Sequence, residues 1–124
     1  MTLYESFLEA VTTEYDTLRV LKQSPRGTVS VVRHKKSGTR YVFRRYSGSG
    51  EVYRRLLPVL CPHLPQIMEA AEQDGQTAVL EEYVQGDTLA ELLMGARLTE
   101  REARQVTMQL CQALHVLHSM GAVH

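Results

Sequence analysis

Residues 28–46 read TVSVVRHKKSGTRYVFRRY, and this stretch decides the fold of the chain around it. β-Branched and aromatic residues fill both of its ends, which is typical of β-strands. The polar sequence KKSGT at 35–39 separates the two ends and supplies the glycine of a turn. The stretch therefore predicts two antiparallel strands, at 28–34 and 40–46, joined by a short connection.

The pattern continues on both sides of this hairpin. A Pro-Arg-Gly turn at 25–27 follows a strand that begins near Asp16, so three strands form a meander. Asp74-Gly75 predicts the turn of a second hairpin, and Thr99 begins a capping box for a long helix. The other elements expected are helices at 2–12, 51–57, 88–94 and 99–120 and strands at 66–72 and 77–84.

The positive charge is concentrated in one part of the chain. The 124 residues suit a single domain, and 44% of them are apolar and 23% charged, a globular balance. The formal net charge is zero, but the segment Arg19–Arg55 holds eleven of the fourteen Lys and Arg residues and only one acid, Glu51. A basic half indicates a phosphate-bearing partner, either nucleotide or nucleic acid, although cations on the solvated face of a sheet would alone produce about half of the asymmetry.

Cysteines and termini exclude several classes of protein. Cys61 and Cys111 lie in no metal-ligand spacing, which favours two reduced thiols in an intracellular protein and no metal site. The N-terminal sequence MTLYESF carries an acid where a signal peptide carries base. No stretch approaches the ~18 apolar residues of a membrane span. We expect a cytoplasmic protein without a membrane partner.

Three features of the meander and the helix after it are weak signals individually and are considered together: the first turn, Arg44 and Glu51. The first turn, LKQSPRGTV at 21–29, keeps only Gly27 of a G-x-G-x-x-G phosphate loop and is by itself an ordinary β-turn. Arg44 ends the sequence YVFR on the third strand, and Glu51 begins the next helix. On their own, these two residues are an exposed arginine and an acid that the helix dipole favours.

Two further motifs follow downstream. In LEEYVQGDTL, at 80–89, a strand passes into a linker and a short helix, and LCQALHVLHSMGAVH, at 110–124, ends a long helix at a histidine. In this order and at these spacings, residues 16–124 resemble the N-terminal lobe of a eukaryotic-like serine/threonine protein kinase, up to the start of the His-Arg-Asp catalytic loop, with His124 as its histidine. The resemblance implies an α+β fold: a five-stranded antiparallel sheet with an αC-type helix, then a hinge and a long αE-type helix. It divides the chain into an N-lobe at 1–84, with the N-terminal helix at 2–12, and a linker with helices at 85–124.

The resemblance also implies a nucleotide site. Arg44 and Glu51 take the positions of the lysine–glutamate pair of kinases. Glu81 lies where the family lines the back of the adenine pocket with an apolar residue. Because a guanidinium is a planar fork and can pair with a carboxylate through two hydrogen bonds, Lys22 is a second candidate for the phosphate cation. The implied cofactor is ATP, with Mg²⁺ in a longer parent, bound by Leu21, Lys22, Gly27, Val29, Val42, Arg44 and the backbone groups of Glu82 and Val84.

The catalytic Asp, the Asn and the Asp-Phe-Gly aspartate of the family would all follow His124. We therefore expect this chain alone to be inactive and to bind nucleotide weakly or not at all, with phosphoryl transfer to a protein substrate belonging to the parent. An apolar face on the last helix, formed by Val106, Leu110, Ala113, Leu114 and Leu117, predicts a homo-oligomer.

Two alternatives remain open from the sequence. The first is a pseudokinase-like binding or dimerisation module that does not use ATP, degenerate at Lys22, Ser24, Glu81 and Arg44. The second is a nucleic-acid binder that uses the basic segment Arg19–Arg55. The nucleic-acid alternative is the weaker one, because no aromatic stacking platform interleaves the cations.

Overall fold

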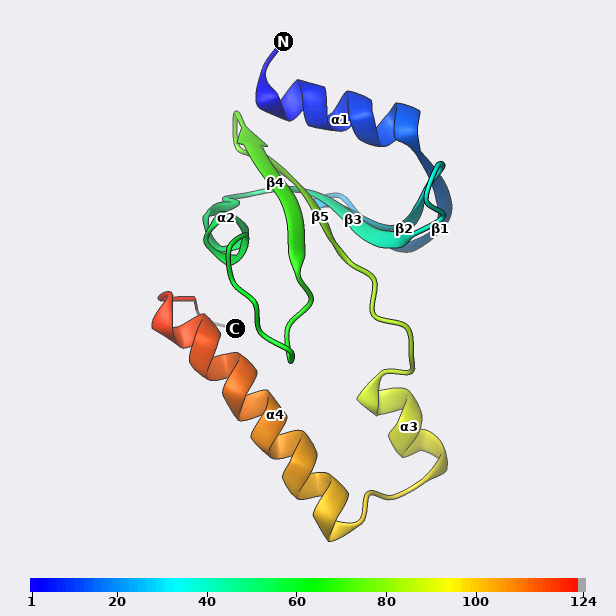
Figure 1. The fold of residues 1–124 in the computed structure, drawn as a ribbon, viewed down its shortest axis with the longest axis vertical. Helices are drawn as coiled ribbons and strands as arrows, with labels where there is room; N and C mark the ends of the chain where they lie inside the picture. The colour runs from blue at the N-terminus through cyan, green and yellow to red at the C-terminus, as the bar shows by residue number, and fades with distance from the viewer. Residues whose placement is uncertain (123–124) are drawn as a thin grey trace. The chain divides into compact units, whose positions relative to one another are not determined.

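The computed structural model describes residues 1–122 and contains a five-stranded antiparallel sheet with four helices (Figure 1). Every predicted helix and strand forms, and each begins and ends within two residues of its predicted bounds. The elements are α1 (Leu3–Glu14), β1 (Tyr15–Ser24), β2 (Gly27–His34), β3 (Arg40–Ser47), α2 (Glu51–Leu56), β4 (Ile67–Gln73), β5 (Gln76–Glu82), α3 (Leu89–Gly95) and α4 (Glu100–Ser119). The α+β fold class expected from the sequence is confirmed.

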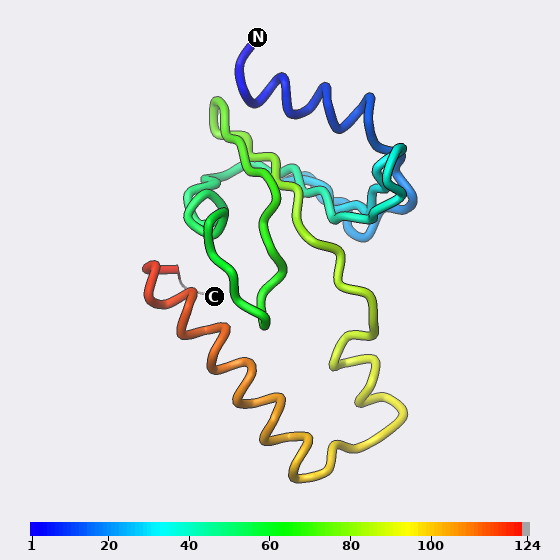
Figure 2. The backbone as a smooth tube through the Cα atoms, viewed as in Figure 1, coloured from blue at the N-terminus to red at the C-terminus, as the bar shows by residue number. Residues whose placement is uncertain are grey.

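The order of the strands in the sheet is β1-β2-β3-β5-β4, and all neighbours are antiparallel. The first three strands form the predicted meander, and the chain then passes through α2 before the second hairpin (Figure 2). The turn of this hairpin has positive φ at Asp74 (52°) and Gly75 (76°), as a two-residue turn between twisted strands requires. Because β5 lies beside β3, the segment that leads into the linker occupies the interior of the sheet.

A separate apolar cluster covers each face of the sheet. Side chains of adjacent residues in a strand point to opposite faces, so Leu80 and Val79 belong to different clusters. On one face, Tyr4 and Val11 of α1 pack on Val32, Phe43, Ala78 and Leu80. On the other face, Val79, Ile67 and Ala70 pack with side chains that include Tyr53, Leu56 and Leu57 from α2 and the residue after it. The face that α2 covers also carries the candidate site.

The chain divides into two compact units. The first comprises Met1–Leu60 and Pro65–Tyr83 and holds α1, α2 and the whole sheet. The second comprises Cys61–Leu64 and the described residues from Val84 onward, with α3 and α4.

Helix α4 begins with the predicted capping box. The Thr99 side chain accepts a hydrogen bond from the Glu102 backbone N–H (3.1 Å), and the Thr99 backbone N–H donates to Glu102 Oε1 (2.9 Å). The backbone hydrogen bond to Thr99 is the main reason that the pKa of Glu102 lies below its usual value, and the Thr99 side chain adds to the effect. A carboxyl whose pKa is lowered by folding stabilises the helix at neutral pH, and this contribution is lost as the pH falls through the lowered pKa.

We expect Thr99→Ala to weaken the first turn of α4 by about 1 kcal/mol, because an N-cap hydroxyl is lost. The same change should return the pKa of Glu102 toward its usual value. A carboxyl-detected NMR titration, together with amide exchange at the start of α4, measures both effects. Thr99→Ser keeps the hydroxyl and serves as the control; a Glu102 pKa that is the same in the alanine and serine variants would contradict the capping argument.

Candidate functional site

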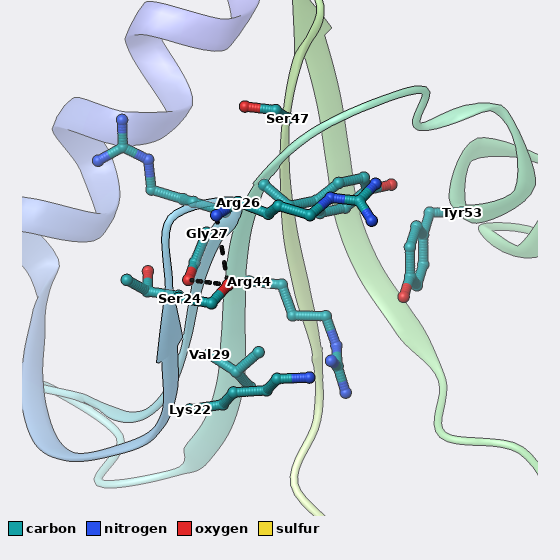
Figure 3. Close-up of a pocket in the computed structure, with 11 residues that line it drawn as sticks. Lys22, Ser24, Arg26, Gly27, Val29, Arg44, Ser47 and Tyr53 are labelled. Atoms are coloured by element: carbon teal, nitrogen blue, oxygen red, sulfur yellow. Dashed lines mark hydrogen bonds between the residues drawn. The ribbon is translucent and has the colours of Figure 1, made fainter.

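A cavity of about 440 Å³ opens in the first unit where β1, β2 and β3 face α2 (Figure 3). Its lining consists of Lys22, Ser24, Arg26, Gly27, Thr28, Val29, Arg44, Arg45, Tyr46, Ser47 and Tyr53. Four of these residues are cations and none is an acid. The cavity is therefore a basic pocket, and a ligand that carries negative charge is the natural complement to it.

Strand register brings the two best-placed cations onto one face. Val29 lies opposite Arg44 on β3 and opposite Lys22 on β1, so the three side chains form a row across the sheet. The β1–β2 register shifts between Val20 and Lys22, and Leu21 has no opposite residue. In a regular ladder Lys22 would lie opposite Thr28 and point to the α1 face. The irregularity at Leu21 thus places the Lys22 side chain in the pocket.

Gly27 lines the pocket, but the reason for a glycine there is the packing of the sheet. A Cβ at this position would lie 2.0 Å from the Arg45 carbonyl oxygen and 2.7 Å from Tyr46 Cα. Both atoms belong to the backbone of β3, so no side-chain rotation relieves the contact. Gly27 is therefore required for the approach of β2 to β3, whatever the pocket binds.

The predicted pairing of Arg44 with Glu51 is wrong. Arg44 instead binds Glu81 of β5, with Nε at 2.9 Å and Nη2 at 2.7 Å from Glu81 Oε1. The register explains this, because Arg44 lies opposite Val79 and Glu81 is the next residue of β5 on the same face. Glu51 is more than half exposed and pairs with Arg55, one helical turn along α2.

The partner of Arg44 dominates its electrostatics. Burial acts to lower the pKa of the Arg44 guanidinium, but the hydrogen bond to Glu81 and its negative charge act in the opposite direction, and the net pKa is raised. Tyr53 and Tyr46 contribute further in the same direction. Arg44 is therefore charged at neutral pH, and its charge lies beside the Glu81 carboxylate.

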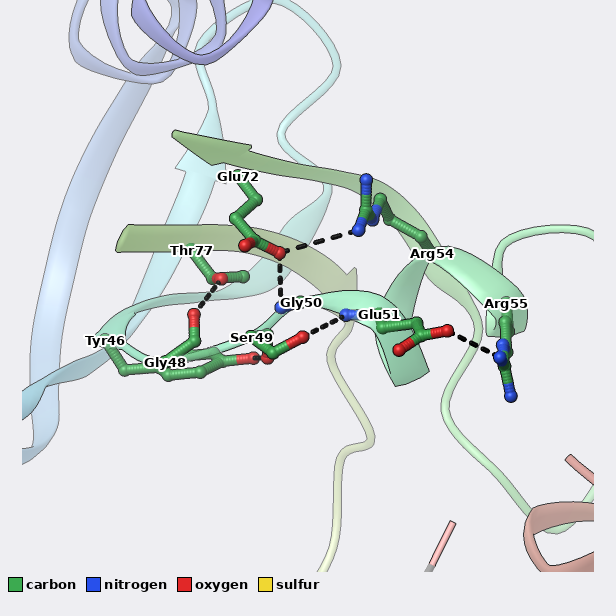
Figure 4. Close-up of polar contacts among 9 residues, drawn as sticks. All are labelled: Tyr46, Gly48, Ser49, Gly50, Glu51, Arg54, Arg55, Glu72 and Thr77. Atoms are coloured by element: carbon green, nitrogen blue, oxygen red, sulfur yellow. Dashed lines mark hydrogen bonds and ion pairs between the residues drawn. The ribbon is translucent and has the colours of Figure 1, made fainter. Parts of the chain in front are cut away.

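Polar contacts tie the first turn of helix α2 to the sheet (Figure 4), and Tyr53 of this helix lines the pocket. The Gly50 N–H donates to Glu72 Oε1 (2.8 Å), which also pairs with Arg54 at 3.5 Å. Thr77, fully buried, donates to the Gly48 carbonyl (2.7 Å) and leaves no room for a Cβ at Gly50. Side chains at positions i and i+2 of a helix point about 200° apart, so Glu51 faces solvent when Tyr53 faces the sheet.

The pocket unites four of the predicted site residues and not the others. Lys22, Gly27, Val29 and Arg44 line it. Leu21 is half exposed, and Val42 is buried on the same face of the sheet, opposite Glu81. Glu82 ends β5 and pairs with Tyr41, whereas Val84 is exposed and belongs to the second unit. The predicted catalytic-loop residue His124 lies outside the described residues.

Sequence reasoning did not select seven of the eleven lining residues, among them Tyr46, Tyr53 and Arg26. Tyr46 and Tyr53 form an aromatic contact at its edge, with ring centroids 6.1 Å apart. Arg26, which the sequence places in the basic segment and in the turn at 25–27, borders the cavity. The sequence could have indicated Tyr53, because it lies two residues after Glu51 and therefore on the opposite side of α2.

Within residues 1–122 the structure contains no group of three or more His, Cys, Asp or Glu side chains that could hold a metal ion. No helix in this part of the chain combines the length and apolar character needed to cross a membrane.

Comparisons with known proteins fit this architecture. No protein-family model matches the chain. Rho-associated protein kinase 1 of Homo sapiens is 25% identical over 122 residues, which cover 90% of this chain and 9% of that protein. The probable cell division protein kinase ECU11_1290 of Encephalitozoon cuniculi is 33% identical over 66 residues, or 53% of this chain and 21% of that protein. The chain spans about a tenth of the length of the Rho-associated kinases.

A solved structure shares the fold. The crystal structure of Rad53 1-466 in complex with AMP-PNP superimposes with a TM-score of 0.73 at 19% identity, over 95% of this chain and 35% of that one. The sheet, the helix after its third strand and the helices after its fifth strand are therefore those of a known architecture. This chain has the fold of a protein-kinase N-lobe, and its relatives in sequence are protein kinases.

Proposed function

We propose that the first unit on its own binds ATP weakly, and that in a complete kinase domain it is the nucleotide-binding lobe of an enzyme that transfers phosphate to serine or threonine of a protein substrate. The observation that carries this proposal is the basic pocket. Lys22 of β1 and Arg44 of β3 enter it from the two sides of β2, and Arg26 and Arg45 border it. A nucleoside triphosphate supplies the negative charge that such a lining attracts.

The relatives support a nucleotide rather than a nucleic acid as the ligand. Both proteins compared above by sequence are kinases, and the Rad53 chain was crystallised with AMP-PNP. The pocket also has walls, formed by Val29 and Tyr53, that suit a compact ligand. Magnesium would be held by the nucleotide's own phosphates, since no acid lines the pocket.

Thermal unfolding of the chain with ATP, with and without Mg²⁺, tests this function. A ligand that binds only the folded state stabilises it by about 2.7 kcal/mol at a concentration one hundred times its Kd. We expect the melting temperature to rise with ATP concentration, and to rise less with adenosine, which carries no phosphate. Equal effects of ATP and adenosine, or no effect of ATP, would contradict a phosphate-binding pocket.

A homo-oligomer formed through α4 stays a prediction. On the predicted face of this helix, Leu110 is 54% exposed, Val106, Leu114 and Leu117 are partly exposed, and Ala113 is buried. Apolar side chains in this condition favour association. We expect light scattering at micromolar concentration to give a dimer mass, and Leu110→Glu to shift it to the monomer. A monomer mass for the unmodified chain would refute the prediction, and Gln109→Glu provides a control that adds the same charge to the neighbouring position.

We also place the protein in the cytoplasm. Cys61 and Cys111 are both free thiols in the structure. Unpaired cysteines suit a reducing compartment. Localisation of a tagged full-length protein by fractionation tests this assignment.

A further inference from the structure

Glu81 is the one buried acid of the described chain, with 6% of its surface exposed. It lies in β5 among Val79, Leu80 and other core residues, in the interior of the sheet. A carboxylate in this position is costly unless a cation and hydrogen bonds compensate it. The compensation comes from Arg44, through two contacts to the same oxygen, Oε1.

The pair with Glu81 uses only some of the hydrogen-bond donors of Arg44. A guanidinium has five N–H donors, and Nε and Nη2 use two of them on Glu81. The Arg44 side chain is 35% exposed, whereas that of Glu81 is 8% exposed. Arg44 also lines the basic pocket, and Glu81 does not. The cation therefore faces the pocket while the anion lies behind it.

We propose that Glu81 competes with the phosphates of a ligand for Arg44, and thereby lowers the affinity of the basic pocket for phosphate. This inference rests on the proposed nucleotide site and names the residue that tunes it. Lys22 faces the same pocket, whose lining contains no acid, so its ammonium group has no such competitor there.

The backbone makes this competition permanent. Arg44 and Glu81 belong to hydrogen-bonded neighbouring strands, and their separation is set by the β3–β5 register. A carboxylate on α2 would follow any movement of that helix, but Glu81 stays in place when α2 moves. Because Glu81 is buried, it cannot turn toward water when a phosphate arrives. A phosphate that approaches Arg44 therefore also approaches a fixed negative charge.

The test uses Glu81→Gln, which removes the charge and keeps the shape of the side chain, and tripolyphosphate as the probe. Calorimetric titration should give an affinity for tripolyphosphate at least about fivefold higher in this variant than in the unmodified chain. Added salt should weaken tripolyphosphate binding in both chains, because the cations of the open pocket are screened, and should leave most of the difference between them, because Glu81 is buried. Glu9→Gln removes the same charge from an exposed position on α1 and should leave the affinity unchanged. Circular dichroism first establishes that each variant is folded.

Glu81→Met, which fills the space with an apolar side chain, provides a second variant should the glutamine variant unfold. An unchanged or lower tripolyphosphate affinity in the folded variant overturns the inference, because Glu81 would then hold Arg44 in a useful position. A parallel titration with ATP separates this outcome from failure of the proposed function. If the unmodified chain binds neither ligand and the Glu81 variant binds tripolyphosphate, the competition is supported and ATP binding by the native pocket is not. If no variant binds tripolyphosphate, both fail.

Discussion

Gly27→Ala is expected to destabilise the first unit by about 3 kcal/mol or more, a large part of the stability of a small domain. The added methyl group would lie 2.0 Å from the Arg45 carbonyl oxygen, and relief requires β2 and β3 to separate. The β2–β3 pair is central to the meander, so the damage should spread to the whole sheet. Chemical denaturation followed by circular dichroism measures the change.

Gly38→Ala is the matched control for this prediction. Gly38 lies in the turn after β2 and has a positive φ of 73°, and a methyl group added to it would meet no atom within 4 Å beyond its chain neighbours. Its replacement costs only the backbone strain of a left-handed residue, roughly 1–2 kcal/mol. A Gly27 variant that is no less stable than the Gly38 variant would show that the strands yield easily, and that Gly27 serves the pocket instead of the sheet.

Lys22→Met is expected to lower the affinity for ATP by at least about tenfold, equivalent to about 1.4 kcal/mol. Methionine retains the aliphatic part of the side chain and removes the ammonium group. Lys22 faces the pocket beside Arg44, whose charge Glu81 partly compensates, so its loss removes much of the attraction for phosphate. Titration with ATP at low and at moderate salt measures the effect.

Lys36→Met controls for the loss of one positive charge. Lys36 is exposed in the turn after β2 and does not line the pocket. We expect this variant to bind ATP as the unmodified chain does. Equal losses in the two variants would mean that the ligand senses the overall basic character of the segment and not the pocket, which would favour the nucleic-acid alternative.

Most of the fold was predictable because each element carries its own local signal. The alternation in YVFRRY, the glycine turns and the capping box at Thr99 all act within a few residues. The position of β5 beside β3 has a different origin, since it depends on packing between distant segments. The sequence predicts five antiparallel strands, but hydrophobic periodicity does not determine this order.

The site was less predictable than the fold. The sequence identifies both Lys22 and Arg44 as candidates, but it offers Glu51, the nearest acid along the chain, as the partner of Arg44. The true partner, Glu81, is thirty-seven residues away and comes into range through the β3–β5 register. The sequence shows that Glu81 is an acid where the kinase family has an apolar residue. It does not show that Arg44 of β3 lies close enough to pair with it. Pairings of this kind are decided between strands, not along them.

Because Leu21 has no opposite residue, the register between β1 and β2 decides which β1 side chain faces the pocket. β1 is an edge strand, and a slide of its last residues by one position would regularise the ladder, bring a leucine opposite Val29 and withdraw the ammonium group to the far side. Excision of Leu21 has the opposite consequence, because the shortened strand keeps Lys22 opposite Val29 without an irregularity at this point, although the register shift between Thr17 and Arg19 remains. Deletion of Leu21 should therefore keep Lys22 in the pocket, whereas a regular ladder of the original length would remove it.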